Sequence, residues 1–547
     1  MNFGRLFHTI RWLKPVQVFG RPWFALKRRL LTAGNPGKLC KLACELKGQL
    51  PFDRQNPFEL RFLNLVQQFV PAEMKWHSRE FPAATEKLWL YNLNYFNWLF
   101  DGQLDGQPQL QLYLMLDWIE KNDSSRSETW EPYVVSRRLC NWVMWLQQQN
   151  GSADPYNDCI LQSISGQCRR LWYDLEYHLQ ANHLLENLRA LFITTVFLVE
   201  KAGEFAKDLE QRLEYCAKEL VEQIRLQFFA DGGHFERSPM YHLEMLDAVE
   251  AVRLANRRLL QFAAAGSSLF RQAKILETLC EDKVPLLRDW LAVMTHPDGK
   301  IAQFNDATLK AGITRKSGQM NYLLDSSGFF VRRTDDSYFV LSCGEPSPAF
   351  QPGHTHCDIM SFELSLAGLR CIVDTGCGSY QSAQIRDECR RTSAHNLPMI
   401  EHAEQSDLWA QFRIGKRARV VHRYFDSEHN RFEMEMLDQY GQRYRREIIF
   451  GEASIRVRDR MFDRRVTGTF ISLLHLAPQV QVVPGNEPGA YDFAVGNCEF
   501  RVATSARLRF EGHVWYPDFG LPVKAEKLIL SNHETEAIDY VISWKTA

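Results

Sequence analysis

The spacing of apolar residues changes once along this 547-residue chain, and that change constrains the fold more than any single motif. Between about residue 55 and residue 295, apolar residues recur every three or four positions, which is the period of amphipathic or buried helices. Helices joined by short polar turns pack as antiparallel neighbours, in a bundle or in a toroid of helical hairpins. At least eight helices are predicted, over Glu59–Gln68, Leu110–Lys121, Ser136–Gln149, Ile160–Gln180, His183–Lys201, Phe205–Phe229, Leu243–Ala264 and Ser268–Met294.

Beyond His296-Pro297-Asp298-Gly299 the pattern becomes that of short strands bounded by turn residues, typical of an antiparallel β-sandwich. The predicted strands include Gly328–Arg333, Tyr338–Ser342, Ser361–Leu366, Leu369–Val373, Ala418–Phe425, Arg431–Asp438, Arg446–Phe450, Ala453–Arg458, Thr469–Leu474, Glu499–Ala503, Arg507–Glu511 and Ala537–Ser543. We therefore predict an α+β multidomain chain, with a helical domain at residues 1–315 and an antiparallel β-sandwich at residues 316–547. A cleft between two such domains is the usual place for an active site.

Composition and charge exclude several classes of partner. The formal net charge of -1 gives no nucleic-acid signature for the whole chain, so we expect no nucleic-acid partner. No segment approaches the roughly 18 consecutive apolar residues of a transmembrane helix. Thirteen cysteines without a Cys-x-x-Cys pair are typical of buried, reduced thiols, which favours a reducing compartment.

The first 31 residues intersperse basic and aromatic side chains and lack the unbroken apolar core of a signal peptide. Two interpretations stay open for this segment. It is either a basic, partly helical arm that packs on its own domain or an element that contacts a membrane surface. We expect a cytoplasmic or membrane-peripheral location, with the periplasm as the alternative, and the sequence carries no signal for the oligomeric state.

Two histidines, His354 and His356, follow a Pro-Gly turn and precede a predicted strand. Phe362, Leu364 and Leu366 alternate with polar residues in that strand, the pattern of a strand with one buried face. Residues two positions apart at such a junction project to the same side. Either both imidazoles serve one site as metal ligands or proton carriers, or the pair is an ordinary surface His-x-His.

The helical half holds two further polar clusters. Asn182, Glu186 and Arg189 fall on one face at a helix start, with His183 beside them, and such a cluster could bind a carboxylate. Helix capping by Asn182 is the alternative. The second cluster is the loop at residues 231–242, in which Tyr241 is either a packing residue or a proton carrier. A proton carrier would need a cationic neighbour, because a free tyrosine has a pKa of about 10.

A third group consists of His356, Asp374 and His395. Two imidazoles and one carboxylate, with a water completing the shell, make a plausible zinc site. Because these ligands are scattered along the chain, their spacing alone identifies no motif. The alternative is that Asp374 is a turn residue and His395 a capping residue.

Nine segments between residues 88 and 400 form an ordered series of motifs: Leu88–Phe96, Trp130–Tyr133 with Ser136–Arg138, Asn182–Asn187, Gly233–His242, His296–Gly299, Phe304–Asp306, Pro352–Asp358, Ile372–Gly376 and Arg391–Asn396. This series resembles the heparinase II/III superfamily of polysaccharide lyases. The resemblance implies an incomplete (α/α) toroid followed by an antiparallel β-sandwich. It also implies β-elimination at a uronic acid of an acidic polysaccharide substrate.

The resemblance further implies roles for individual residues. Asn182 would bind the uronate carboxylate and stabilise the charge that develops when the C5 proton leaves. Tyr241 would transfer the proton to the leaving oxygen, and His354 would act as its partner base or orient it. The residues that would bind substrate are His183, Glu186, Arg237 and His242. A structural Zn²⁺ would be held by His356, Asp374 and His395.

Characterised secreted members of the superfamily carry signal peptides, and their absence from this sequence suggests a role in surface-polysaccharide metabolism. Two other functions stay open. A glycoside hydrolase on the same scaffold would need two carboxylates flanking the bond, for which Glu186 with Glu236 or Glu244 are the candidates. The other is a non-catalytic glycan-binding or assembly protein.

Overall fold

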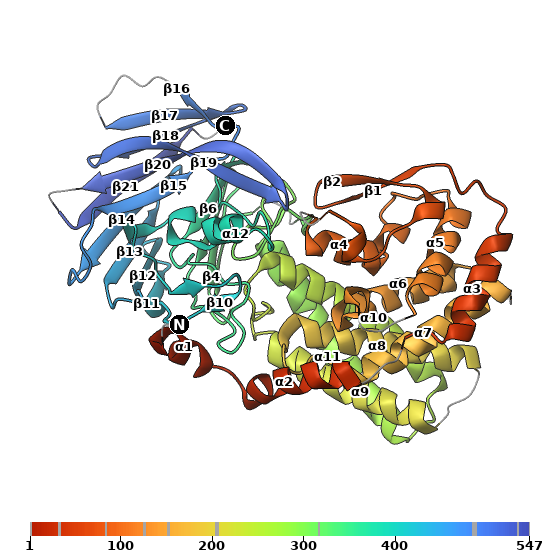
Figure 1. The fold of residues 1–547 in the computed structure, drawn as a ribbon. Coiled ribbons are helices and arrows are strands. Elements are labelled where there is room, and N and C mark those ends of the chain that lie inside the picture. Colours follow the sequence, from red (N-terminus) through yellow and green to blue (C-terminus); the bar gives the residue numbers. More distant parts are fainter. Residues whose placement is uncertain are drawn as a thin grey trace. The chain divides into compact units, whose positions relative to one another are not determined.

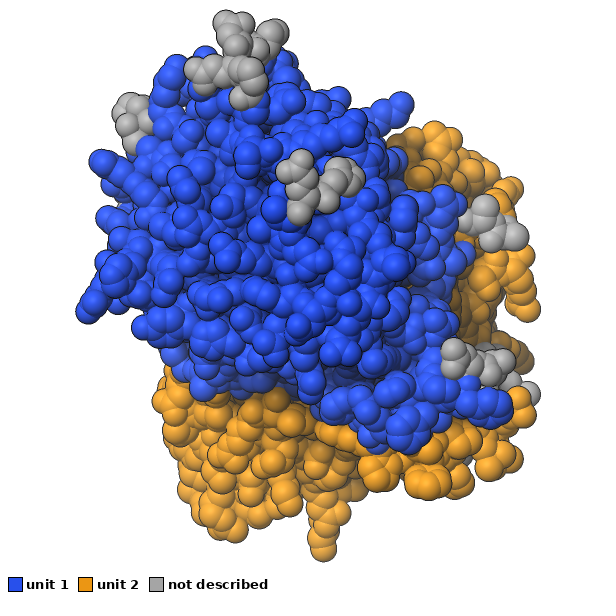
Figure 2. Space-filling view, turned by 90° about the vertical axis from the view of Figure 1, so that its left-hand side faces the viewer, with its two compact units in different colours: residues 1–13, 227–244, 285–547 blue, residues 14–226, 245–284 orange. Residues whose placement is uncertain are grey.

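The computed structural model describes residues 3–30, 34–82, 85–123, 127–149, 154–202, 207–314, 318–483, 489–532 and 535–545. The chain forms two compact units, coloured separately in Figure 2. Unit 1 comprises residues 1–13, 227–244 and 285–547, and unit 2 comprises residues 14–226 and 245–284. The predicted change from helices to strands is confirmed, since the last long helix ends at Val293 and the first strand of unit 1 begins at Met320. The domain boundary at residues 315 and 316 stays a prediction.

Long helices dominate the first 293 residues (Figure 1). The helices there are α1 (Phe3–Ile10), α2 (Pro15–Leu30), α3 (Gly37–Gln49), α4 (Lys87–Tyr95), α5 (Pro108–Lys121), α6 (Pro132–Gln148), α7 (Pro155–Tyr173), α8 (Ala181–Ala202), α9 (Lys207–Gln227), α10 (Pro239–Phe262) and α11 (Ser268–Val293). Helices α5 to α11 confirm seven of the predicted segments, although Phe205 lies outside the described residues. The toroid arrangement implied by the resemblance stays a prediction.

Helix α7 shows why the predicted ends were inexact. It begins at Pro155, where proline is tolerated because the first helical N–H has no partner anyway, and the Asp154 carboxylate caps it by accepting the Asn157 N–H at 2.8 Å. It ends at Tyr173 because Asp174 leaves the helical conformation, whereas apolar spacing alone extended the helix to Gln180.

The helix predicted over Glu59–Gln68 is wrong. This segment is an antiparallel hairpin of β1 (Phe58–Phe62) and β2 (Leu65–Phe69). Strand β1 buries alternate residues, and the turn residues Leu63 and Asn64 both adopt positive φ, at 53° and 62°. Two consecutive residues in that conformation make a tight hairpin turn. The spacing of apolar residues, from which the helix was predicted, carries no information about this turn.

Unit 2 has an aromatic core. Six tryptophans of this unit are fully buried, among them Trp118, which lies 3.9 Å below the Arg138 guanidinium. The same guanidinium donates to Gln167 at 2.8 Å and to the carbonyl of Thr129 at 2.9 Å. Helix packing in this unit therefore includes a buried guanidinium with two nitrogens that reach acceptors on neighbouring elements and a third that is buried without a hydrogen-bond partner.

The strands of unit 1 form three main antiparallel sheets. The five-stranded sheet has the order β3-β4-β5-β6-β7, formed by Met320–Leu324, Phe329–Arg333, Ser337–Ser342, Phe362–Leu366 and Leu369–Ile372. The eight-stranded sheet has the order β11-β12-β13-β14-β21-β18-β17-β16, formed by Arg419–Asp426, Arg431–Leu437, Arg443–Phe450, Ser454–Phe462, Ala537–Trp544, Cys498–Thr504, Ala490–Val495 and Gln481–Val483. The four-stranded sheet has the order β19-β20-β15-β8, formed by Arg507–Asp518, Leu521–Asn532, Phe470–His475 and Pro398–Ile400.

A single apolar cluster joins these three sheets, which confirms the predicted antiparallel, sheet-rich C-terminal part. Phe339 and Phe362 of the five-stranded sheet, Phe432 of the eight-stranded sheet and Leu473 of the four-stranded sheet all belong to it. A short hairpin of β9 (Leu408–Trp409) and β10 (Arg413–Ile414) and the helix α12 (Ala383–Arg390) complete the unit.

The prediction that β6 has only one buried face is wrong. All five residues of this strand are buried, because the other face of the sheet packs on a second cluster that includes Trp290 and Phe304. The polar side chains that alternate along β6 are paired within this interior. Glu363 accepts a hydrogen bond from His296 at 2.7 Å, and Ser365 contacts the other ring nitrogen of the same histidine at 2.8 Å. The alternation of apolar and polar residues along β6 therefore reflects two buried environments, one apolar and one hydrogen-bonded, rather than a core face and a solvent face.

The thirteen cysteines are all free thiols, and ten of them are buried. This confirms the prediction that they do not form a disulfide framework. No helix in the described part of the chain is both long and apolar enough to cross a lipid bilayer.

One buried ion pair connects the eight-stranded sheet to loops of unit 1. Arg446 on β13 faces Asp459 on β14, and two of its nitrogens lie 2.7 Å from the two carboxylate oxygens. The remaining nitrogen donates to the backbone carbonyls of Met360 at 2.6 Å and Asn396 at 2.7 Å. These carbonyls flank the segments that carry His356 and His395, so Arg446 anchors both segments to the sheet.

We expect Arg446→Ala to lower the free energy of unfolding of unit 1 by about 3–5 kcal/mol, because it leaves the Asp459 carboxylate buried without its partner. The neighbouring Arg445 pairs with Glu433 on the partly exposed side of the strand, and its substitution should cost at most about 1 kcal/mol. Urea unfolding followed by near-ultraviolet circular dichroism measures both variants. Equal losses for Arg446→Ala and Arg445→Ala would contradict the anchoring role.

Candidate active site

Tyr241 lies in the first turn of α10, where a cap fixes its position. The Tyr241 N–H donates to the Ser238 hydroxyl oxygen at 3.3 Å, and this hydroxyl donates to the backbone carbonyl of Asp306 at 2.5 Å. Pro239 begins the helix, a position where the missing N–H costs nothing. The capping serine therefore ties the start of α10 to the segment that carries Asp306.

The structure brings Tyr241 and His354 together, as the sequence predicted. Their ring centroids are 3.9 Å apart, and the Tyr241 hydroxyl lies 3.0 Å from the hydroxyl of Tyr380. Burial, followed by the charges of Glu244 and Asp306, raises the pKa of Tyr241 well above its usual value. Tyr241 is therefore a protonated phenol that contacts an imidazole and a second phenol.

Asp306 is the acceptor that both histidines of the His-x-His pair share. One carboxylate oxygen lies 2.7 Å from Nδ1 of His354, and the other lies 2.8 Å from Nε2 of His356. The Arg386 guanidinium binds the same carboxylate with two nitrogens, one of them at 2.7 Å. The prediction that both imidazoles project to one side is confirmed, because they meet at a single side chain.

The charge state of Asp306 follows from these contacts. Burial alone would raise the pKa of its carboxyl, but Arg386 and the two histidines outweigh burial and hold this pKa well below its usual value. An ionised carboxylate can only accept hydrogen bonds. Nδ1 of His354 therefore carries a proton, which it donates to this carboxylate. By the same argument His356 is protonated on Nε2 and has its lone pair on Nδ1.

The sequence reasoning assigned no role to Asp306 or to its neighbour Asn305. Asp306 is 48 and 50 residues away from the two histidines, so no spacing pattern could connect them. Asn305 adopts a positive φ of 59°, a conformation that asparagine tolerates better than most residues. Its amide accepts from the His356 N–H at 3.0 Å and donates to the Arg237 carbonyl at 2.8 Å. The only feature of the sequence that pointed to these two residues was the motif Phe304–Asp306 in the series that resembles the family.

His356, Asp374 and His395 form a buried group that can bind a metal ion. Their potential ligand atoms all lie within 4.8 Å of one another. His395 contacts one Asp374 oxygen through Nδ1 at 2.7 Å, while its Nε2 and the Nδ1 of His356 are buried without a hydrogen-bond partner. Burial lowers the pKa of His356 to about 3, which keeps this imidazole neutral. Two buried, unpartnered ring nitrogens beside a carboxylate are the donor set expected of a metal site.

The predicted site residues of unit 2 lie together at the start of α8. The Asn182 side-chain oxygen accepts from the His183 N–H at 3.0 Å, and His183 contacts Glu176 at 3.2 Å. Glu186 is fully buried and paired with Arg189 at 2.9 Å. Burial favours its neutral form, but Arg189 and Arg137 outweigh burial and lower its pKa. Glu186 is therefore an ionised carboxylate within an arginine pair.

Two predicted substrate-binding residues of unit 1 have their polar groups engaged by the protein. Arg237 is buried and donates to the carbonyl oxygens of Ser327 at 2.6 Å, Gly328 at 3.0 Å and Glu345. His242 contacts the Leu287 carbonyl at 2.9 Å with Nε2 and accepts from the His234 N–H with Nδ1. Burial lowers the pKa of His242 to about 3. Substrate binding by these two residues stays a prediction.

Glu236, a candidate acid for the hydrolase alternative, is buried in unit 1. Neither of its carboxyl oxygens has a hydrogen-bond partner, and His234 lies 3.9 Å away. Burial, followed by the nearby charges of Asp306 and Glu244, raises its pKa well above the usual value. Glu236 is therefore a neutral carboxylic acid.

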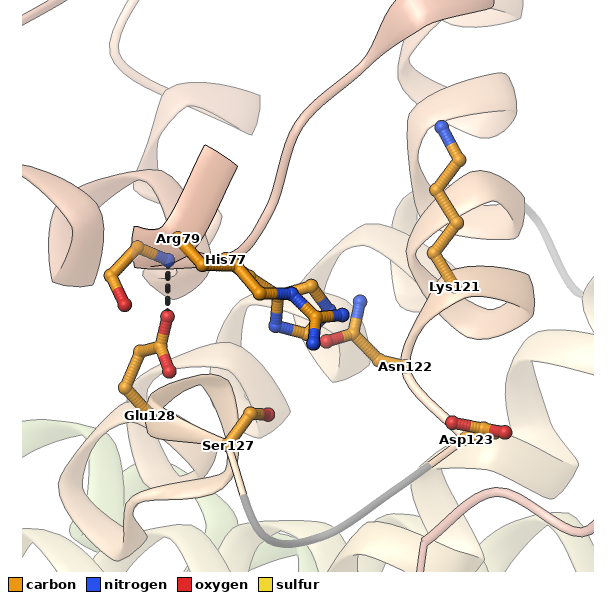
Figure 3. A pocket seen from close by; sticks show the side chains of 8 residues that line it. His77, Arg79, Lys121, Asn122, Asp123, Ser127 and Glu128 are labelled. Carbon is orange, nitrogen blue, oxygen red and sulfur yellow. Dashed lines mark hydrogen bonds between the residues drawn. The ribbon is translucent and has the colours of Figure 1, made fainter. Parts of the chain in front are cut away.

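A separate pocket of about 330 Å³ lies in unit 2, and Figure 3 shows its lining. Charged side chains of both signs line it, including Arg79, Lys121, Asp123 and Glu128. The Glu128 carboxylate accepts from the Ser78 N–H, which is the dashed line in Figure 3. None of the site residues predicted from the sequence is among its lining residues.

Comparisons with known proteins bear on both halves of the chain. The family model "Heparinase II/III N-terminus" matches residues 108–323, and "Heparinase II/III-like, C-terminal" matches residues 318–545. A heparin-sulfate lyase of Pedobacter heparinus is 24% identical over 326 residues, which are 53% of this chain and 48% of that protein. The chain therefore matches about half the length of this curated relative.

Two solved structures share the fold. The heparan sulfate lyase HepC from Pedobacter heparinus superposes with a TM-score of 0.60 at 16% identity, covering 94% of this chain and 84% of that one. A heparinase III superposes with a TM-score of 0.63 at 16% identity, covering 83% and 76%. The helical part followed by antiparallel sheets is thus an architecture that this chain shares with both.

We expect Asp306→Asn to lower the free energy of unfolding of unit 1 by about 3–5 kcal/mol, because the neutral amide leaves the Arg386 guanidinium buried without a counter-charge. Glu388→Gln is the matched control, since it makes the same isosteric change on the exposed side of α12 and should cost at most about 0.5 kcal/mol. Urea unfolding of both variants tests this. An Asp306→Asn protein as stable as the parent would rule out the central role of this carboxylate.

Proposed function

Because the chain belongs to the heparinase II/III family, we propose that it is a lyase that cleaves an acidic, uronate-containing polysaccharide by β-elimination. The observation that carries the proposal is the contact between Tyr241 and His354, with His354 oriented by Asp306. An imidazole and a phenol in contact supply the base and the acid that an elimination requires. The relative from Pedobacter heparinus is named for a lyase reaction, which supports the same reaction class here.

His354 is the proposed base. Its Nδ1–H donates to the Asp306 carboxylate, so the other ring nitrogen, Nε2, is the atom that would accept the C5 proton of the uronate. The electron pair of the broken C5–H bond forms the C4=C5 double bond as the bond from C4 to the leaving O4 breaks. The Asp306 carboxylate stabilises the imidazolium that results, because it lies next to the protonated ring.

Tyr241 is the proposed acid that donates its phenolic proton to the leaving O4. The cationic neighbour expected from the sequence is not among the groups that shift its pKa, which burial and the charges of Glu244 and Asp306 raise. Tyr241 therefore stays protonated and keeps a proton to donate, which is the acid role rather than the base role. Tyr380 lies within hydrogen-bonding distance of the same hydroxyl and so orients it. The proton then returns to Tyr241 from solvent or from His354 to restore the starting state.

Asn182 is the proposed residue that binds the uronate carboxylate and stabilises the enolate-like charge. The support is its place at the start of α8, where the helix dipole also favours negative charge. His183 and Glu186, next to it in the sequence, are proposed to position the substrate, with Glu186 acting through Arg189. Arg237 and His242 are proposed to contribute to substrate binding indirectly. Their hydrogen bonds hold the conformation of the loop at residues 231–242, and this loop would contact the substrate.

Tyr241→Phe should lower the rate of elimination by about 10²–10⁴-fold, because it removes the proton that the leaving oxygen takes. Asn182→Ala should lower kcat by about 10²–10³-fold, because it removes a donor to the developing charge. The assay is the ultraviolet absorbance of unsaturated uronate ends, measured with a panel of uronate polymers. Tyr424→Phe is the matched control, because this tyrosine is exposed on β11 and should leave the rate unchanged.

The products distinguish the alternatives. New reducing ends without the unsaturated absorbance would establish hydrolysis, with Glu236 as the first residue to test because it is a neutral, buried acid. Binding of a uronate polymer by the parent protein without any cleavage would instead establish a glycan-binding protein. A Tyr241→Phe variant with the parent rate would remove Tyr241 from the mechanism.

We also propose that the metal held by His356, Asp374 and His395 is zinc in a structural role. Two imidazole nitrogens with one carboxylate, and a fourth position for water, are ligands that zinc favours. The support is the pair of unpartnered ring nitrogens beside Asp374. The other nitrogen of His356 is bound to Asp306, so a metal at this site would brace the carboxylate that orients His354.

The purified protein should contain about one zinc ion per chain, and His356→Ala should abolish its retention because it removes one of three protein ligands. Metal content is measured by mass spectrometry after dialysis. His422→Ala is the control, because this histidine is exposed on β11 and outside the group. A fully folded parent protein that binds no zinc would refute the assignment.

A further inference from the structure

Helix α2 presents a stripe of large apolar side chains to solvent. The stripe comprises Val16, Phe19, Trp23, Leu26 and Leu30, whose spacing of three and four residues places them on one helical face. Phe19 is 74% exposed, Trp23 63% and Leu30 70%. A helix on the surface of a domain normally turns such a stripe towards the core, so this orientation is the reverse of the usual one.

The face of α2 that packs on unit 2 lies beside the stripe and carries Gln17, Gly20 and Phe24. Gln17 is fully buried, and Phe24 stacks on His178 with ring centroids 4.1 Å apart. Gly20 lies so close to the same histidine that a Cβ there would be 3.1 Å from the His178 Cβ. These contacts dock the helix through this face, which leaves the apolar stripe outward.

Helix α1 repeats this arrangement in unit 1. Phe3, Phe7 and Ile10 follow one face, and none of the eight residues of this helix is buried. Polar contacts attach the helix, since Arg5 binds Asp407 at 2.9 Å and Thr9 accepts from the Trp409 ring N–H at 3.1 Å. The two successive helices therefore both attach by one side and expose aromatic and aliphatic side chains on the other.

The part of the chain that contains α1 and α2 is also strongly basic. Residues 1–44 contain nine lysines and arginines and not one aspartate or glutamate, although the whole chain has a net charge of -1. Arg29 at the end of α2 is exposed next to the stripe. The segment thus combines an outward apolar face with a concentrated positive charge.

We propose that α2 binds the surface of an anionic lipid membrane, with its apolar stripe in the boundary between headgroups and acyl chains, and that α1 binds such a surface through its own apolar face. Basic helices with aromatic and leucine side chains on one face bind anionic interfaces in this way, by apolar burial and by attraction to the headgroups. A second copy of the chain fits the apolar stripe less well than a membrane does, because it would bring two strongly basic segments together. An acidic glycan would pair with the cations but leave valine and leucine in water. The proposal is independent of the proposed reaction.

The experiment is flotation of the full chain with vesicles of phosphatidylcholine alone and of an equal mixture of phosphatidylcholine and phosphatidylglycerol. The parent should bind the anionic vesicles and lose binding at high salt, because the attraction is screened. Phe19→Asp with Trp23→Asp should weaken binding at least about tenfold, because each removes an apolar side chain from the interface. Arg29→Gln should weaken binding to the anionic vesicles about fivefold.

The matched control is Leu254→Asp with Ile275→Asp, which makes the same change at two exposed apolar positions elsewhere in unit 2 and should bind as the parent does. Thermal unfolding checks that both double variants are folded. Three results would overturn the proposal: no binding of the parent to anionic vesicles, equal loss in the control, or a dimer by light scattering that Phe19→Asp with Trp23→Asp dissociates while vesicle binding persists.

Discussion

The arrangement of the candidate active site depends on one buried carboxylate. Asp306 is fully buried and receives hydrogen bonds from two imidazoles and two nitrogens of a guanidinium. Removing either the Asp306 carboxylate or the Arg386 guanidinium would leave the other as an unpaired buried charge, which costs several kcal/mol. The carboxylate fixes a proton on Nδ1 of His354 and on Nε2 of His356, so a single electrostatic constraint orients both rings. The His354 ring then lies against Tyr241, and His356 keeps an unpartnered Nδ1 in the group that it forms with Asp374 and His395.

The rest of unit 1 holds the groups around this carboxylate in place. The five-stranded sheet is buried on both faces, so its polar side chains form an internal network of hydrogen bonds instead of a solvated surface. Arg446 extends this network from the eight-stranded sheet to the loops next to His356 and His395. The capping serine of α10 connects Tyr241 to the Asp306 backbone. Helix α10 and the buried sheets thus fix the positions of Tyr241 and the two histidines, which is the preorganisation that the proposed reaction would need.

The N-terminal helices follow a different rule from the rest of the chain. Elsewhere, stripes at helical spacing face the interior, and the seven confirmed helices could be found from them. In α1 and α2 the same spacing marks a solvent-facing surface, because polar contacts and the close approach at Gly20 dock another face. Periodicity reports that a helix has an apolar face, but packing decides where that face points.

The sequence by itself determined that a part rich in long helices precedes a part rich in strands, because periods of 3.6 and 2 reflect local geometry. The resemblance of its motifs to a known family also led us to expect Tyr241 beside His354, and His356 beside Asp374 and His395, and the structure brings both sets together. The sequence misassigned the hairpin at residues 58–69, where five-residue strands and a helical turn share similar apolar spacing. It could not reveal Asp306 as the shared acceptor, nor the burial of both faces of β6. These features are contacts between residues tens of positions apart, and only the tertiary structure decides which distant side chains meet without water between them.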